Sequence, residues 1–140
     1  MDPTSSARLM ESLNRDAERI ALQFGLRYKS IGAERANVTR RYGVCFSDGV
    51  IRIRLRHAVT GRPLKYSSLV NTLCHELAHL RHFNHGPRFK IFYFELLEFA
   101  RVRGIYCPGR PELVQPAQRP PAAHRERETR SVLPQQLVLF

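Results

Sequence analysis

Cysteine is scarce in this chain of 140 residues, which has only Cys45, Cys74 and Cys107. The three are far apart, odd in number and never form a Cys-x-x-Cys pair. Disulfide-stabilised domains carry even sets of cysteines, and cysteine zinc sites use closely spaced pairs. Neither class is indicated, and we expect reduced thiols in a cytosolic protein.

Long apolar runs are also missing. No stretch approaches the roughly 18 apolar residues that a membrane-spanning helix needs. The polar N-terminus does not have the basic start and apolar core of a secretory signal. We therefore expect a cytoplasmic protein that does not have a membrane as its partner.

Acidic residues are few: 12 Asp and Glu stand against 23 Lys and Arg, which gives a net charge of +11. Most of the basic residues are arginines. Such an excess favours an anionic partner, with nucleic acid ahead of an anionic membrane surface. An arginine-rich proteome would give the same composition without any binding. We expect DNA as a partner, and hence a nucleoid-associated position in the cytoplasm.

Helical and extended patterns alternate over residues 1–107, which predicts one α+β domain. Apolar residues at helical spacing predict a first helix over 5–24, which Gly25 ends. Extended patterns, broken by a hairpin turn at 47–49, predict a sheet of three to four strands over residues 26–31, 38–46 and 50–57.

Two more helices are predicted after the sheet. The first covers 67–83, with Ser67 or Ser68 as its N-cap. The second begins at Pro87, which suits a first helical turn, and ends before Gly104. From residue 108 onward prolines recur, which predicts a flexible linker over 108–134 and a separate peptide at 135–140.

The segment His75-Glu76-Leu77-Ala78-His79 lies within the first of these two helices. Residues four apart lie on the same face of a helix, so His75 and His79 can bind one metal ion. Glu76 lies beside them, where it can accept the proton of a metal-bound water. This pattern indicates a zinc site with its own general base.

A third ligand has to approach from outside the helix, because side chains on successive turns form a row. His85 follows the predicted helix end, where a left-handed Asn84 can turn the chain back. We therefore expect His85 as the third ligand, with Glu95 or Glu98 as alternatives and His82 outside the ligand set. Three imidazoles leave a position for water, which indicates peptide hydrolysis by a catalytic Zn²⁺.

These residues resemble the SprT-like and YgjP-like zinc metallopeptidases over roughly residues 30–100. The resemblance is carried by Tyr42-Gly43-Val44-Cys45, by Gly49-Val50-Ile51-Arg52-Ile53 and, most specifically, by the run from His75 to Phe89. It implies a small zincin-type α+β domain, with His75, His79 and His85 as ligands and Glu76 as base. SprT-like relatives cleave proteins trapped on DNA, which implies a DNA-bound or DNA-crosslinked protein as substrate.

The C-terminal peptide Gln136-Leu137-Val138-Leu139-Phe140 resembles the peptide by which bacterial proteins bind the replication sliding clamp. In such a peptide Gln136 makes hydrogen bonds, while Leu137, Leu139 and Phe140 fill apolar pockets. The alternatives are a tail that packs back on the domain and a chance match.

The strand over 50–57 alternates apolar residues with arginines, so three guanidiniums should line one face. We expect phosphate contacts from five arginines: Arg52, Arg54, Arg56, Arg40 and Arg41. A solvated strand face is the alternative. Two other functions stay open: an adaptor for DNA or the clamp with a structural metal, and a general cytosolic metallopeptidase with no DNA role.

Overall fold

Helix α1 (Pro3–Phe24) begins the fold of residues 3–109, the part of the chain that this computed structural model describes. Leu13, Ala17 and Ile20 on its inner face are fully buried. Gly25 ends the helix with φ 67°, a left-handed conformation that glycine adopts without strain. The predicted first helix is confirmed. Most of the predicted linker and the whole terminal peptide lie outside the described residues.

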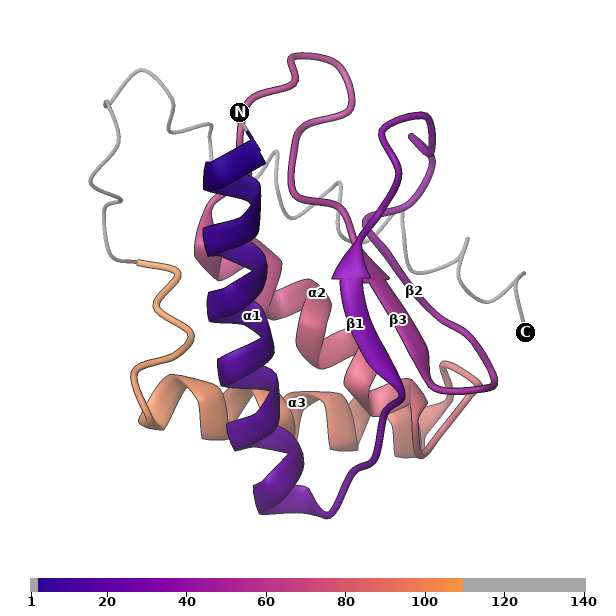
Figure 1. Cartoon of the computed structure of the whole chain (residues 1–140). Helices are drawn as coiled ribbons and strands as arrows, with labels where there is room; N and C mark the ends of the chain where they lie inside the picture. The colour runs from indigo at the N-terminus through magenta and orange to yellow at the C-terminus, as the bar shows by residue number, and fades with distance from the viewer. Residues whose placement is uncertain (1–2, 110–140) are drawn as a thin grey trace.

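A three-stranded sheet lies beside the helices (Figure 1). Its strands are β1 (Ser30–Ala33), β2 (Gly43–Cys45) and β3 (Val50–Ile53), in the order β1-β3-β2. β3 pairs in parallel with β1 and in antiparallel with β2, so β2 is an end strand. The predicted turn joins β2 to β3: Gly49 has φ 94°, and Asp48 accepts a hydrogen bond from the Val50 amide.

The strands are shorter than the sequence predicts. The alternation continues as far as Leu55, which is buried. However, Ala33 at the end of β1 and Gly43 at the start of β2 both lie opposite Ile53. Beyond Ile53 the backbone makes only separate bonds, from the Arg54 amide to the Tyr42 carbonyl and in an isolated bridge between Arg56 and Pro63, so the sheet ends there.

Helix α2 (Tyr66–His79) is central, because it packs against α1, α3, β2 and β3. Its N-cap is Lys65, so the prediction of a serine N-cap was wrong. Ser67 is instead buried inside the first turn. The helix also ends four residues earlier than predicted: after Leu80 the chain turns through a bond from the Arg81 amide to the Ala78 carbonyl.

Helix α3 (Pro87–Val102) lies below α2 and passes behind α1 in Figure 1. Pro87 is its first residue, as predicted, and Gly86 is its N-cap. The prediction that Asn84 adopts a left-handed conformation is wrong, since only glycines have positive φ among the described residues. Nevertheless, the α+β prediction of three helices and a small sheet is confirmed.

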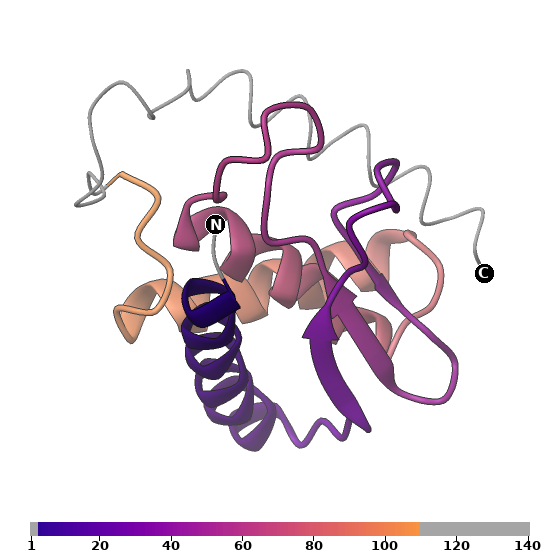
Figure 2. The same cartoon turned by 45° about the horizontal axis from the view of Figure 1, so that its top comes forward.

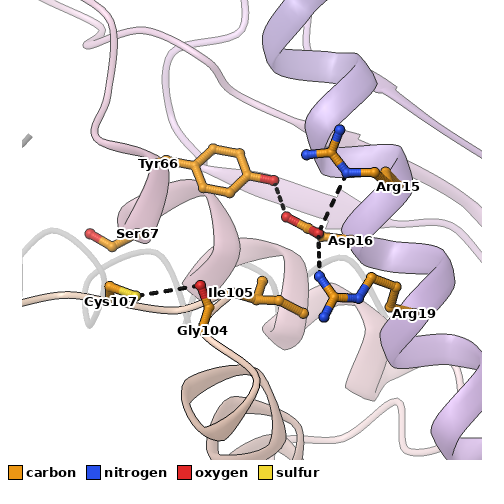
Figure 3. A pocket seen from close by; sticks show the side chains of 8 residues that line it. All are labelled: Arg15, Asp16, Arg19, Tyr66, Ser67, Gly104, Ile105 and Cys107. Carbon is orange, nitrogen blue, oxygen red and sulfur yellow. Dashed lines mark hydrogen bonds and ion pairs between the residues drawn. The ribbon is translucent and has the colours of Figure 1, made fainter. Parts of the chain in front are cut away.

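A cavity of about 300 Å³ lies between α1, the start of α2 and the segment after α3 (Figure 3). The buried carboxylate of Asp16 forms part of its wall and accepts a hydrogen bond from the Tyr66 hydroxyl at 2.6 Å. Arg19 and Arg15 approach the same carboxylate at 3.3 and 4.0 Å. This cluster ties α1 to the first turn of α2.

All three cysteines are free thiols, which agrees with the prediction. None of the helices in residues 3–109 is long and apolar enough to cross a membrane.

Gly43 lets β2 approach α2 closely. A Cβ atom at this position would lie 2.6 Å from the Thr72 methyl and 3.1 Å from the Glu76 side chain. We predict that Gly43→Ala lowers the free energy of unfolding by about 1–3 kcal/mol, as overpacking does. Adding Thr72→Ser, which removes that methyl, should restore part of the loss.

Gly32→Ala is the matched control, because a Cβ there meets nothing within 4 Å. It should leave the free energy of unfolding unchanged or raise it by up to about 1 kcal/mol. Urea titration measures all three variants. Equal stability of Gly43→Ala and Gly32→Ala would contradict the tight contact.

Candidate metal centre

His75 and His79 lie one turn apart on the buried face of α2, and their ring centroids are 4.8 Å apart. The two residues are only 3% and 0% exposed. They lie in the last part of the helix, where α2 packs between β2 and α3. The helical pair predicted from the sequence is therefore present and faces the interior.

His85 completes the group from outside the helix. Its Nε2 lies 2.9 Å from Nε2 of His79, and its ring centroid is 5.0 Å from that of His75. The three residues each offer a ring nitrogen, and these nitrogens lie within 4.8 Å of one another. The early end of α2 produces this arrangement, because the chain can then return between His79 and α3.

The alternative ligands lie elsewhere. Glu95 is exposed on α3, and exposed Glu98 pairs with Arg101 at 2.5 Å. The His82 ring packs on Phe92, with 5.8 Å between centroids. Within residues 3–109, none of these side chains joins the group of three histidines.

His82 nevertheless contributes through its backbone. Nδ1 of His79 donates a hydrogen bond to the His82 carbonyl at 3.0 Å. This bond fixes the neutral tautomer in which the Nε2 lone pair of His79 is available. Such an outer hydrogen bond commonly orients a metal-binding imidazole.

Glu76 is fully buried, and its Oε2 lies 3.3 Å from Nδ1 of His75. Gly43 of β2 faces the same carboxylate, because a Cβ atom added at this glycine would lie 3.1 Å from Oε2 of Glu76. The predicted base thus lies between the histidines and the end strand of the sheet.

The three imidazoles are uncharged at neutral pH. Burial lowers the pKa of His75 to about 3 and that of His79 to about 4, because it disfavours the charged ring. Burial lowers the pKa of His85 to about 4, and the nearby His75 adds to this effect. Neutral imidazole is the form that binds a metal ion.

The buried ring nitrogens fit a metal ion. Nε2 of His75 has no hydrogen-bond partner among the residues that the structure describes, and Nε2 of His85 lies against Nε2 of His79. Burying such groups unpaired is costly. A set of three imidazole nitrogens suits Zn²⁺ in both ligand type and number.

Phe89, Tyr93 and Asn71 support the site but were not assigned roles from the sequence. The Phe89 ring contacts all three imidazoles, at centroid distances of 4.9 Å from His75, 4.5 Å from His79 and 4.8 Å from His85. Tyr93 packs against Phe89 and donates a hydrogen bond to the Asn71 side chain. Their helical spacing could have indicated this role. Asn71 lies four residues before His75, and Tyr93 lies four residues after Phe89, so each shares a helix face with a residue of the site.

The predicted arginine face is only partly present. Arg54 is only 8% exposed, so the prediction that it lies on an open strand face was wrong. Its amide bonds to the Tyr42 carbonyl at 2.8 Å, which brings the Tyr42 ring to 4.7 Å from the guanidinium. Arg41 is paired with Glu34 at 2.9 Å. The other predicted arginines remain accessible to different degrees: Arg52 is half-buried, and Arg40 and Arg56 are exposed.

Comparison with solved structures supports the fold. Two crystal structures of Wss1 from Saccharomyces cerevisiae, one of a mutant, each match with a TM-score of 0.66 and 17% identity. The first match covers 74% of this chain and 84% of Wss1, and the second covers 75% and 87%. At this identity the likeness establishes a common fold.

Comparison with protein families and curated proteins gives one match. None of the curated proteins matches the sequence. A family model described as YgjP-like, metallopeptidase domain, matches residues 3–101. That range contains all three helices almost completely, the sheet and the histidine group. The chain belongs to the YgjP-like metallopeptidase family.

Proposed function

We propose that this metallopeptidase is a zinc-dependent endopeptidase that acts on proteins bound or crosslinked to DNA. The observation that carries the proposal is the convergence of three uncharged imidazoles beside the buried Glu76 carboxylate. Family membership supports peptide hydrolysis, and the donor set supports zinc.

His75, His79 and His85 would hold the ion through their ring nitrogens. Zinc, when bound, lowers the pKa of a water molecule towards about 7 and polarises a carbonyl oxygen. Glu76 accepts the proton of the attacking water and delivers it to the departing amine nitrogen. The His82 carbonyl and the Phe89 ring keep the His79 imidazole in its orientation.

The substrate chain would pair with the end strand β2. This strand lies beside α2, and Gly43 brings its backbone next to Glu76. An extended peptide that adds to a sheet edge is held by main-chain hydrogen bonds, largely independently of its side chains. This mode of binding suits a protease that meets many different proteins.

The DNA part of the proposal is supported by charge. The net charge of +11 favours a polyanion, and Arg40, Arg52 and Arg56 are at least partly accessible. The resemblance to SprT-like peptidases points to the same substrate class. Clamp binding by Gln136, Leu137, Leu139 and Phe140 stays a prediction, because these residues lie outside the described part of the chain.

The adaptor alternative needs a closed structural site, and such a site has four protein ligands. The group has three in the described residues. Cys45 does not join the three histidines within the described residues, and its thiol donates instead to the Phe46 carbonyl. The open site of a hydrolase is therefore the better account.

Glu76→Gln tests the catalytic role directly. We predict that it lowers the rate of peptide cleavage by about 100-fold or more, since a general base typically contributes 10²–10⁴-fold. Zinc content should stay near one ion per chain. A fluorogenic casein assay and metal analysis of the same preparation measure both. Full cleavage by the variant would contradict the role of Glu76.

His85→Ala and His82→Ala test the ligand set as a matched pair. We predict that His85→Ala loses zinc to a competing chelator at least 100-fold more readily than the parent protein, whereas His82→Ala keeps the parent affinity. The reason is that His85 offers a ring nitrogen, while His82 acts through its carbonyl, which alanine retains. The reverse order would show that His82 is the ligand.

A further inference from the structure

Lys90 and Phe94 are two exposed residues in the first half of α3, and Phe94 is 59% exposed. Because they are four residues apart, their side chains lie on one face of the helix. The beginning of α3 lies toward the sheet and its end toward α1, in Figure 1 and in Figure 2. The pair is therefore on the same side of the molecule as the sheet.

Ring contacts show which way this face points. Phe89 contacts all three imidazoles. The Tyr93 ring centroid lies 5.5 Å from that of His75 and 5.2 Å from that of Phe94. Measured around the helix axis from Phe89, Tyr93 follows at about 40°. Lys90 and Phe94 continue in the same direction, at about 100° and about 140°, so they lie at the edge of the metal centre on the side of His75.

The charge of Lys90 reaches the metal centre and is not neutralised nearby. Burial is the main cause of the low pKa of His85, and the charges of His75 and Lys90 lower it further. Within residues 3–109, Lys90 takes part in none of the ion pairs. No acidic residue lies three or four positions from it on the helix, where a partner would be within reach. Its ammonium group is therefore available to a ligand.

Arg88 has the same charge but lies on the opposite flank of α3. It precedes Phe89 by one residue, as Lys90 follows it, and it is also exposed. Helical geometry places it about 160° away from Lys90, on the side of Phe92. That side carries the His82 ring, which is not part of the histidine group. Arg88 is thus a matched control for Lys90.

A peptide that pairs with β2 would have the first half of α3 on its other side. Helix α2 packs against both β2 and α3, whereas β2 and α3 pack little against each other in the described part of the chain. Alternate side chains of an extended peptide point to the same side and lie about 6.6 Å apart. Lys90 and Phe94 are separated by about 6 Å along the helix axis, which is nearly the same spacing.

We propose that Lys90 and Phe94 select substrates that carry an acidic and an apolar side chain two residues apart, close to the scissile bond. The carboxylate pairs with the Lys90 ammonium, and the apolar side chain packs on the Phe94 ring. The preference is about fivefold, because an ion pair exposed to solvent contributes little more than that. The inference rests on the proposed function and adds a sequence preference to the same site.

Cleavage-site profiling by mass spectrometry tests the preference, with a library of peptides from digested cell proteins as substrate. The proteins are the full zinc-loaded chain, Lys90→Glu, Phe94→Ala and the control Arg88→Glu, and thermal melting checks that each is folded. We expect acidic residues at one position near the cleavage site, about fivefold enriched, with apolar residues two positions away. Lys90→Glu should enrich basic residues at that position instead. Phe94→Ala should lose only the apolar preference, and Arg88→Glu should keep the parent profile.

Peptide binding gives a second readout that does not need cleavage. The full chain carrying Glu76→Gln is titrated into labelled peptides that contain Glu-Ala-Phe or Lys-Ala-Phe, or the reverse order of either, and fluorescence anisotropy is measured. We expect the glutamate peptide to bind about fivefold more tightly in one of the two orders. Adding Lys90→Glu should reverse this preference, whereas adding Arg88→Glu should change it less than twofold.

A cleavage profile and an order of affinities that Lys90→Glu leaves unchanged would overturn the proposed selection, while the peptidase itself would stand. Equal effects of Lys90→Glu and Arg88→Glu would overturn it as well, because they would reflect only the overall charge. If the parent cleaves no peptide at all, the proposed function fails. The binding assay alone would then decide whether the pair on α3 recognises the acidic peptide.

Discussion

The burial of two uncharged imidazoles and one carboxylate at the end of α2, with the half-buried His85 ring beside them, is the constraint on which this structure depends. Polar side chains at this depth cost free energy unless they find partners. His79 finds one in the His82 carbonyl, and Phe89 covers the faces and edges of all three rings. The buried Nε2 of His75, which has no hydrogen-bond partner in the described residues, remains for a metal ion. The core is built around a site that a metal would stabilise.

The point at which α2 ends determines this geometry. Had the helix continued through His82, that ring would have stayed in line with His75 and His79. Instead the chain turns after Leu80, which brings the His82 carbonyl to His79 and returns His85 to the pair. Pro87 then begins α3, which carries Phe89 against the three rings. A few backbone bonds thus convert a helical motif into a three-sided site.

Local spacing made part of this predictable. His75 and His79 share a face in any helix, and Pro87 and Gly104 mark helix ends by their own backbone preferences. The same reasoning failed for Arg54, because the Tyr42 ring that covers it comes from another segment. It also could not explain Gly43, whose role depends on the distance between β2 and α2. The strand ends were missed for the same reason: Leu55 keeps the pattern, but pairing requires partners that stop at Ile53.

The central claim is an open zinc site with three protein nitrogens, and X-ray absorption at the zinc edge of the purified full chain tests it most directly. The account predicts about one zinc per chain, with light-atom ligands near 2.0–2.1 Å and a first shell that changes when a hydroxamate is added. A sulfur shell near 2.3 Å, or a spectrum that no added ligand alters, would mean a closed structural site and contradict the account.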